Sequence, residues 1–168
     1  MGKEKKNPVK IIEKLRIRKD GTFNYREIHH YINDWFMKHG YSYAETKHAE
    51  KSKDSGRDIE SEWSGSRKVT GYIKFRVDIV ITAKDYKDLV LEQNSEKVKT
   101  GVGRLEILFN ASMEKNYDKV FSERKGDWSH FFKETMEKYV MHSNIKNYEE
   151  KLEAEALGLY EMIKDLAG

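Results

Sequence analysis

The sequence contains no cysteine and only one proline, Pro8, among its 168 residues. The absence of cysteine excludes disulfides, thiolate nucleophiles and thiolate metal ligands together. The apolar runs are far too short to cross a bilayer, so no transmembrane segment is expected. No hydrophobic stretch follows the basic start Met1-Gly2-Lys3-Glu4-Lys5-Lys6, so no secretory signal is expected. Together these absences favour a cytoplasmic protein.

Charged residues make up 36% of the chain and hydrophobic residues 38%, which is typical of a patterned globular protein rather than a disordered one. The length fits one domain, predicted over residues 13–168 after a basic N-terminal arm of residues 1–12. Residues 1–19 carry eight Lys and Arg against two Glu, whereas residues 144–168 carry three Lys against six acidic residues. The basic arm is therefore either a solvated tail or a segment that docks on the acidic end or on phosphate.

Alternation of apolar and polar residues predicts one long β-strand from Arg67 to Ala83. A strand of this length implies a large, curved antiparallel sheet with one dry face. Shorter alternating stretches predict further strands over residues 14–18, 41–51, 57–63 and 104–113, and residues 89–92 are a short strand or an edge. Turns are predicted at residues 53–56 and 64–66, and the glycines of residues 101–103 interrupt the pattern before the last strand.

Helical periodicity is present near both ends of the chain. Asn24 is a predicted N-cap with Glu27 three residues later, and the apolar stripe that follows ends at Gly40. Residues 115–166 form a predicted helical region with a break at His142-Ser143-Asn144, after which a long helix packs across the sheet or projects toward a partner. The fold class is therefore α+β: a curved antiparallel β-meander, an N-terminal amphipathic helix packed on one face, and a long C-terminal helix.

No motif in the sequence indicates a catalytic site as clearly as the alternating pattern indicates strands. His29 and His30 are adjacent on the predicted helix and point about 100° apart, so they cannot bind one ion together. His30 and Asp34 have a suitable spacing but lack a third ligand. We therefore predict no metal site and no cofactor, and we favour a non-catalytic protein over the alternative of an enzyme whose cleft is formed by residues distant in the sequence.

Acidic residues on neighbouring predicted strands raise the alternative of a nuclease. Glu60, Asp78 and Glu106 fall on successive strands, but Leu105-Glu106-Ile107-Leu108 lacks the lysine of a Glu-x-Lys motif. The simpler interpretation is cross-strand pairing with Lys74, Arg76 or Arg104 on a solvated sheet face.

Two sets of residues are candidate binding surfaces. An apolar ligand could lie between the first helix and the dry sheet face, in a cavity of about 300 Å³ or more, lined by Trp35, Phe36, Phe75, Ile79 and Phe109. Single-stranded nucleic acid could stack on a basic aromatic surface made of Lys3, Lys5, Lys6, Tyr43, Tyr72, Lys74 and Arg76. The simpler interpretation places most of the aromatic residues in the core and its rim.

The segment from Tyr31 to Tyr41, followed by Glu62-Trp63, Arg67-Lys68-Val69, Tyr72-Ile73-Lys74-Phe75 and Arg104-Leu105-Glu106-Ile107, resembles a group of short archaeal proteins without a known activity. The resemblance spans roughly residues 12–166 and implies a cytoplasmic setting, with no cofactor or catalytic residue to transfer. More loosely, the predicted element order is similar to helix-grip folds, which hold hydrophobic ligands between helix and sheet. The chain departs from that plan by having one early helix where two are expected.

These observations favour a non-catalytic binding or assembly module. It would act through the sheet and the long C-terminal helix on a protein partner or on a second copy of the chain. The alternatives are a carrier of an apolar small molecule and a nucleic-acid-binding protein that uses the basic arm and strand aromatics.

Overall fold

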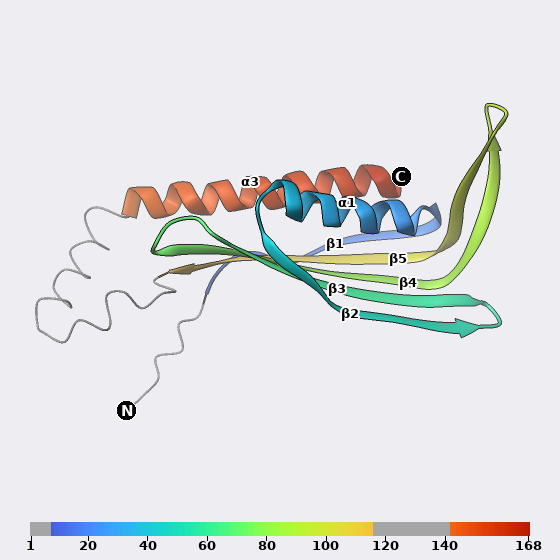
Figure 1. Ribbon diagram of the computed structural model, residues 1–168, viewed down its shortest axis with the longest axis horizontal. Helices are drawn as coiled ribbons and strands as arrows, with labels where there is room; N and C mark the ends of the chain where they lie inside the picture. Colours follow the sequence, from blue (N-terminus) through green and yellow to red (C-terminus); the bar gives the residue numbers. More distant parts are fainter. Residues whose placement is uncertain (1–7, 116–141) are drawn as a thin grey trace, which may run out of the picture.

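The structure, a computed structural model, describes residues 8–115 and 142–168. Its elements follow the order β1 (Val9–Phe23), α1 (Tyr25–Lys38), β2 (Ser42–Lys53), β3 (Gly56–Lys68), β4 (Ile73–Gln93), β5 (Glu96–Lys115) and α3 (His142–Ala167). The strands form one antiparallel sheet in the order β1-β5-β4-β3-β2, and both helices lie on the same side of it (Figure 1). The predicted α+β class with an antiparallel sheet and a C-terminal helix is confirmed. The predicted helical stretch over residues 116–141 lies outside the described residues.

Alternation along the central strands separates a covered face from a solvated one. On β4 every second residue from Ile73 to Ala83 is buried, whereas its neighbours are half-buried or exposed. Phe36 of α1 and Leu159 of α3 are fully buried in the same hydrophobic cluster as Phe75 of β4. Burying these side chains against one sheet face provides the main driving force for the fold.

The strand predicted from Arg67 to Ala83 has the wrong boundaries. β3 ends at Lys68, and a tight turn follows in which the backbone N–H groups of Val69 and Thr70 donate to the carbonyl of Ile73. The turn also uses the Thr70 hydroxyl, which accepts hydrogen bonds from the N–H groups of Tyr72 and Ile73. β4 then continues without interruption to Gln93, through the residues predicted to separate it from a short strand over 89–92.

Two predicted interruptions lie inside strands. Ser64-Gly65-Ser66 belongs to β3, and Gly65 is needed there because a Cβ atom would come within 2.4 Å of the Phe36 ring. The 101–103 segment belongs to β5, where a Cβ atom on Gly101 would come within 2.1 Å of the Tyr86 ring. Both glycines therefore make room for an aromatic side chain and end no strand.

α1 has the predicted start and end. The Asn24 side chain accepts a hydrogen bond from the backbone N–H of Glu27, and the helix ends at Lys38 before Gly40, which has a φ of +70°. The side chains of Ile28, Ile32 and Phe36 are fully buried. Three- and four-residue spacing places them on one face of the helix.

α3 packs against its own sheet. Leu152, Leu159 and Ile163 have no exposed surface, and α3 lies against β1 and β5. Of the two predicted alternatives for the long helix, packing across the sheet is the one observed. No helix among the described residues has both the length and the apolar character needed to cross a membrane.

Candidate functional site

The end of β4 and the beginning of β5 form a ribbon that leaves the sheet (Figure 1). Pairing of β3 with β4 ends at Tyr86, and pairing of β1 with β5 ends at Gly101, whereas β4 and β5 remain paired up to Gln93 and Glu96. We call residues 89–100 the β-arm. No other described strand pairs with the β-arm, so the backbone groups of its two outer edges lack strand partners, although the Lys99 carbonyl accepts a hydrogen bond from the Asn24 side chain.

The β-arm exposes apolar side chains. Leu91 and Val98 face each other across the two strands and are 45% and 40% exposed, and Leu89 lies on the same face two residues before Leu91. Val90, on the opposite face, is 61% exposed. An isolated two-stranded ribbon is at best marginally stable in water, so an apolar face of this kind gains stability when something covers it.

The β-arm ends in a two-residue turn and carries no net formal charge. Asn94 and Ser95 form the two-residue turn with φ values of +52° and +68°, the conformation of a type I′ hairpin turn. Within the β-arm, Glu92 and Glu96 balance Lys97 and Lys99, so its formal charge is zero. A neutral ribbon lacks the positive field that phosphate recognition requires.

The β-arm bends away from the sheet at a bulge in β4. The register with β5 shifts between Lys84 and Lys87, and Asp85 has a φ of +53°. Gly103 on β5 allows the close approach, because a Cβ atom there would come within 2.8 Å of the Lys84 carbonyl. The bulge and the glycine together bend the sheet at this point.

A second feature, a polar cluster, lies between α1 and β2. His29 projects from α1 toward β2, where its Nε2 is 3.1 Å from Oε1 of Glu45. The same carboxylate oxygen is 3.1 Å from Nδ1 of His48. The Ser61 hydroxyl on β3, which is fully buried, is 2.9 Å from Nδ1 of His48 and 2.7 Å from the hydroxyl of Tyr25.

A bulge in β2 brings these side chains together. Strict alternation would place Glu45 and His48 on opposite faces of the strand. The register shifts between Glu45 and Lys47, however, so that Glu45 pairs with Trp63 and His48 pairs with Ser61. Trp63 and Ser61 are both buried on the helix-covered face, and Glu45 and His48 therefore share that face.

Hydrogen bonding sets the charge state of the cluster. Partial burial acts to raise the pKa of the Glu45 carboxyl, but hydrogen bonds from Ser61, His29 and His48 together hold it below its ordinary value. Burial raises the pKa of Tyr25, so its hydroxyl remains protonated. The cluster thus presents a carboxylate between two imidazoles.

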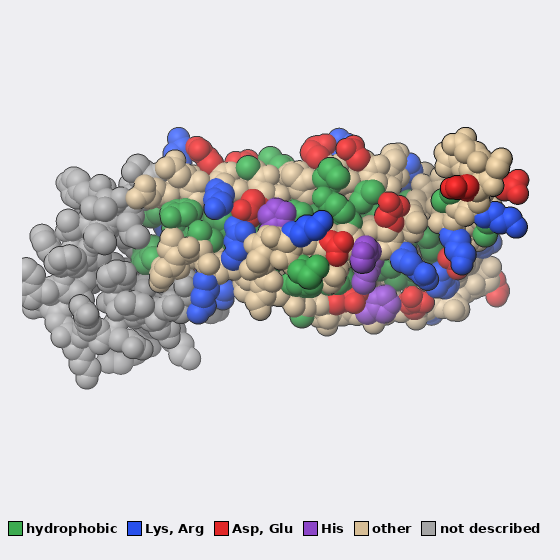
Figure 2. All heavy atoms as spheres, turned by 45° about the horizontal axis from the view of Figure 1, so that its top comes forward, with side chains coloured by type: hydrophobic (Ala, Val, Ile, Leu, Met, Phe, Trp, Pro, Cys, Tyr) green, Lys and Arg blue, Asp and Glu red, His purple; other side chains and the backbone are tan. Residues whose placement is uncertain are grey.

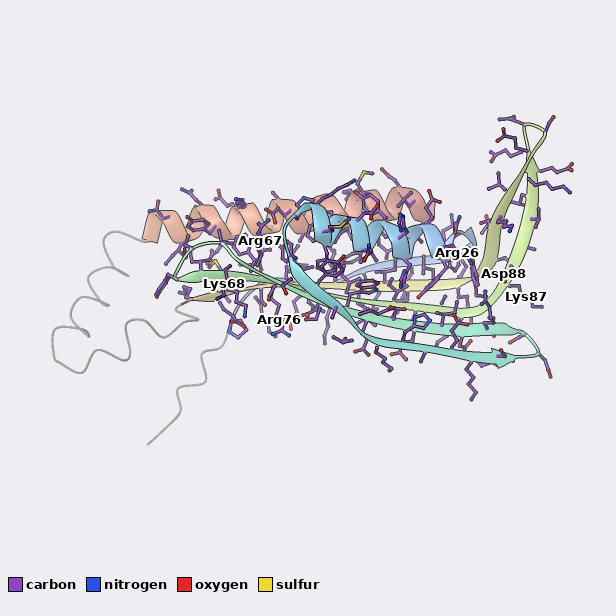
Figure 3. The ribbon with its side chains drawn as sticks, viewed as in Figure 1. Arg26, Arg67, Lys68, Arg76, Lys87 and Asp88 are labelled. Carbon is purple, nitrogen blue, oxygen red and sulfur yellow. The ribbon has the colours of Figure 1, made fainter. Side chains whose placement is uncertain are left out.

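A pocket of about 230 Å³ opens beside this cluster, lined by His29, His48, Arg57, Tyr86 and Asp88, among others. Arg26 of α1 and Asp88 at the base of the β-arm line both this pocket and a neighbouring one of about 410 Å³. Figure 3 shows Arg26 and Asp88 at the point where β4 turns away from the sheet, and Figure 2 shows histidine side chains reaching the surface beside charged ones. The polar cluster and the base of the β-arm are therefore neighbours.

The five residues of the candidate apolar pocket all lie in the core. Trp35, Phe36, Phe75, Ile79 and Phe109 are at most 5% exposed and belong to one continuous hydrophobic cluster. The Phe36 ring fills the space above Gly65 and stacks on Tyr43 with ring centroids 5.1 Å apart. Side chains of the protein itself thus occupy the space around Phe36.

The candidate basic aromatic surface is split between the two sides of the sheet. Tyr43 faces the helices, and its hydroxyl donates to Oδ1 of Asn33. Tyr72 is buried, whereas Lys74 and Arg76 extend from the opposite face, where Lys74 is 4.0 Å from Glu114 and Arg76 is 3.4 Å from Asp78. Lys3, Lys5 and Lys6 lie outside the described residues.

Acidic residues on the solvated face have basic partners, but these are not the predicted cross-strand ones: Asp78 contacts Arg76 of its own strand. Glu106 contacts Arg18 at 2.7 Å, and Glu60 contacts Lys47 at 2.9 Å. The prediction that Arg104 could be a partner of Glu106 is not met, because Arg104 forms an ion pair with Asp85. Each of these acidic groups has a basic neighbour, so the nuclease alternative gains no support from the described residues.

Comparisons with family models, with curated proteins and with solved structures find no significant match.

The sequence did not lead to a prediction of the β-arm or of the polar cluster. The Asn94-Ser95 pair was a usable hairpin signal, because such residues accept a positive φ. Glu45 and His48 gave no such signal, since their proximity depends on a bulge that alternation cannot reveal.

Proposed function

We propose that the protein is a binding module that self-associates through its β-arm. The observation that carries this proposal is the exposed apolar pair of Leu91 and Val98, flanked by the half-buried Leu89, on a ribbon whose edges are unpaired among the described strands. The sheet and two helices then serve as a rigid body that presents the ribbon. This role assigns the binding surface to the β-arm, since α3 is already packed on its own sheet.

A second copy of the chain is the occupant that fits this surface. Identical strand edges can pair antiparallel across a two-fold axis, and identical apolar faces can pack on each other across the same axis. The zero formal charge of the β-arm means that two copies meet without net repulsion. The same neutrality argues against nucleic acid as the occupant.

The test is sedimentation velocity over a wide range of protein concentrations. The unmodified chain should shift from monomer to dimer as concentration rises. A double variant, Leu91→Lys with Val98→Glu, should remain monomeric, because the new ion pair keeps the β-arm neutral and its strands paired while removing the apolar face.

A matched control is Met37→Lys on α1, since Met37 is also apolar and is 60% exposed. This variant should dimerise like the unmodified chain. An unmodified chain that is monomeric at every concentration, or a double variant that still dimerises, would overturn the proposal.

A further inference from the structure

We propose that His29, Glu45 and His48 form a binding site for a divalent transition metal, with zinc as the best match. The three ligand atoms all lie within 4.8 Å of one another. Each imidazole nitrogen is 3.1 Å from Oε1 of Glu45. A tetrahedral zinc ion with ligands at about 2.0–2.2 Å separates its ligand atoms by roughly 3.4 Å. The carboxylate oxygen thus lies near this separation from both nitrogens, and the two nitrogens, which lie within 4.8 Å of each other, adjust by side-chain rotation when the ion enters.

The donor set selects the class of metal. Two imidazole nitrogens and one carboxylate oxygen suit zinc and its neighbours in the first transition row, whereas magnesium and calcium prefer oxygen ligands alone. Three protein ligands leave a coordination position for water or another small ligand. The pocket of about 230 Å³ that His29 and His48 line provides room for it.

Neighbouring side chains hold the ligands in place. The His29 ring packs edge-on against Trp63, with ring centroids 4.9 Å apart, which fixes its orientation on α1. Nε2 of His48 is 3.5 Å from Oε1 of Glu50. When Nδ1 of His48 faces the ion, Nε2 therefore faces a carboxylate, which is the common outer partner of a metal-bound imidazole.

The alternative is a polar cluster satisfied by hydrogen bonds alone, and metal titration separates the two. Isothermal titration calorimetry of the full chain with zinc chloride, after chelator treatment, should show one zinc ion bound per chain. Magnesium chloride should give no binding. His48→Gln should lower the zinc affinity at least about 100-fold, because loss of a direct ligand costs more than loss of an outer partner.

His30→Gln is the matched control. His30 adjoins His29 on α1, but its side chain is 75% exposed and pairs with Asp34. This variant should bind zinc like the unmodified chain. Circular dichroism will establish whether each variant folds.

A second readout needs no variant. Cobalt(II) bound by the unmodified chain should give the visible absorption of a four-coordinate site, which added zinc should remove. Absence of zinc binding, six-coordinate cobalt alone, or a zinc affinity that depends on His30 and not on His48 would each overturn the inference. Because neither readout involves the β-arm, failure here leaves the proposed self-association untouched.

Discussion

Arg67 of β3 and Glu155 of α3 form an ion pair in which Nη2 of the arginine donates to both carboxylate oxygens, at 2.7 and 2.9 Å. The pair also reaches the end of α1, since Nη1 of Arg67 donates to the carbonyl of His39. The hydroxyl of Tyr41 donates to the same carboxylate, and burial, followed by the charge of Glu155, raises the Tyr41 pKa above its ordinary value. These contacts tie both helices to the sheet at one point.

Replacing Glu155 tests this connection. Glu155→Gln should lower the free energy of unfolding by about 2–3 kcal/mol, because it leaves a largely buried guanidinium without a counter-charge. Urea denaturation at neutral pH measures the change. Glu161→Gln on the same helix is the control and should change stability by less than about 0.5 kcal/mol, since Glu161 pairs with Lys164 in an exposed position.

Packing of α3 on the sheet predicts a contrast between two leucines. Leu159→Ala should lower the free energy of unfolding by about 2–5 kcal/mol, because the side chain is fully buried and its removal leaves a cavity. Leu157→Ala, two residues earlier and 39% exposed, should cost less than about 1 kcal/mol. Equal effects in thermal or urea unfolding would mean that α3 does not pack as described.

Gly65 and Gly158 should respond to alanine in opposite directions. Gly65→Ala forces the Phe36 ring to move and should destabilise the fold by about 1–3 kcal/mol. Gly158→Ala should stabilise α3 by about 0.5–1 kcal/mol, because nothing lies within 4 Å of the new Cβ atom. Phe36→Leu should lower the free energy of unfolding less in the Gly65→Ala variant than in the unmodified chain. A double-mutant cycle measures this difference.

The lowered pKa of the Glu45 carboxyl predicts that the free energy of unfolding falls in acid. Its pKa is lower in the folded chain than its ordinary value of 4.5, so it contributes stability above pH 4.5. That contribution is lost as the pH falls from 4.5 through the folded pKa. Urea denaturation from neutral pH to about pH 3 should therefore show a smaller loss for Glu45→Gln than for the unmodified chain. A loss of the same size in both chains would contradict this linkage.

The sequence predicted the elements that local pattern determines. Asn24 and Gly40 delimit α1 because capping depends on residues next to the helix ends. Alternation identified β4 because its buried residues from Ile73 to Ala83 all face one way. For the same reason the turn over residues 69–72 was missed, since those residues continue the alternation of the strand that follows.

Features that depend on distant partners could not be predicted. Ser64-Gly65-Ser66 has the composition of a turn, and only the Phe36 ring explains why it remains a strand. Gly101 and Gly103 accommodate Tyr86 and the backbone of β4. Glu45 and His48 share a face only because of the β2 bulge. Each case requires knowledge of a residue more than ten positions away or of a register shift.

The position of β1 affects how the chain folds during synthesis. β1 pairs with β5 along its whole length, from Val9 opposite Met113 to Phe23 opposite Gly101. During synthesis, β1 therefore emerges from the ribosome long before β5, its neighbour in the sheet, has been made. Until β5 emerges, both edges of β1 lack a partner strand. Pairing of β1 with β5 must also close the long stretch of chain between them, which is slow. A nascent chain halted before residue 96 should consequently be a much better chaperone client than the finished protein.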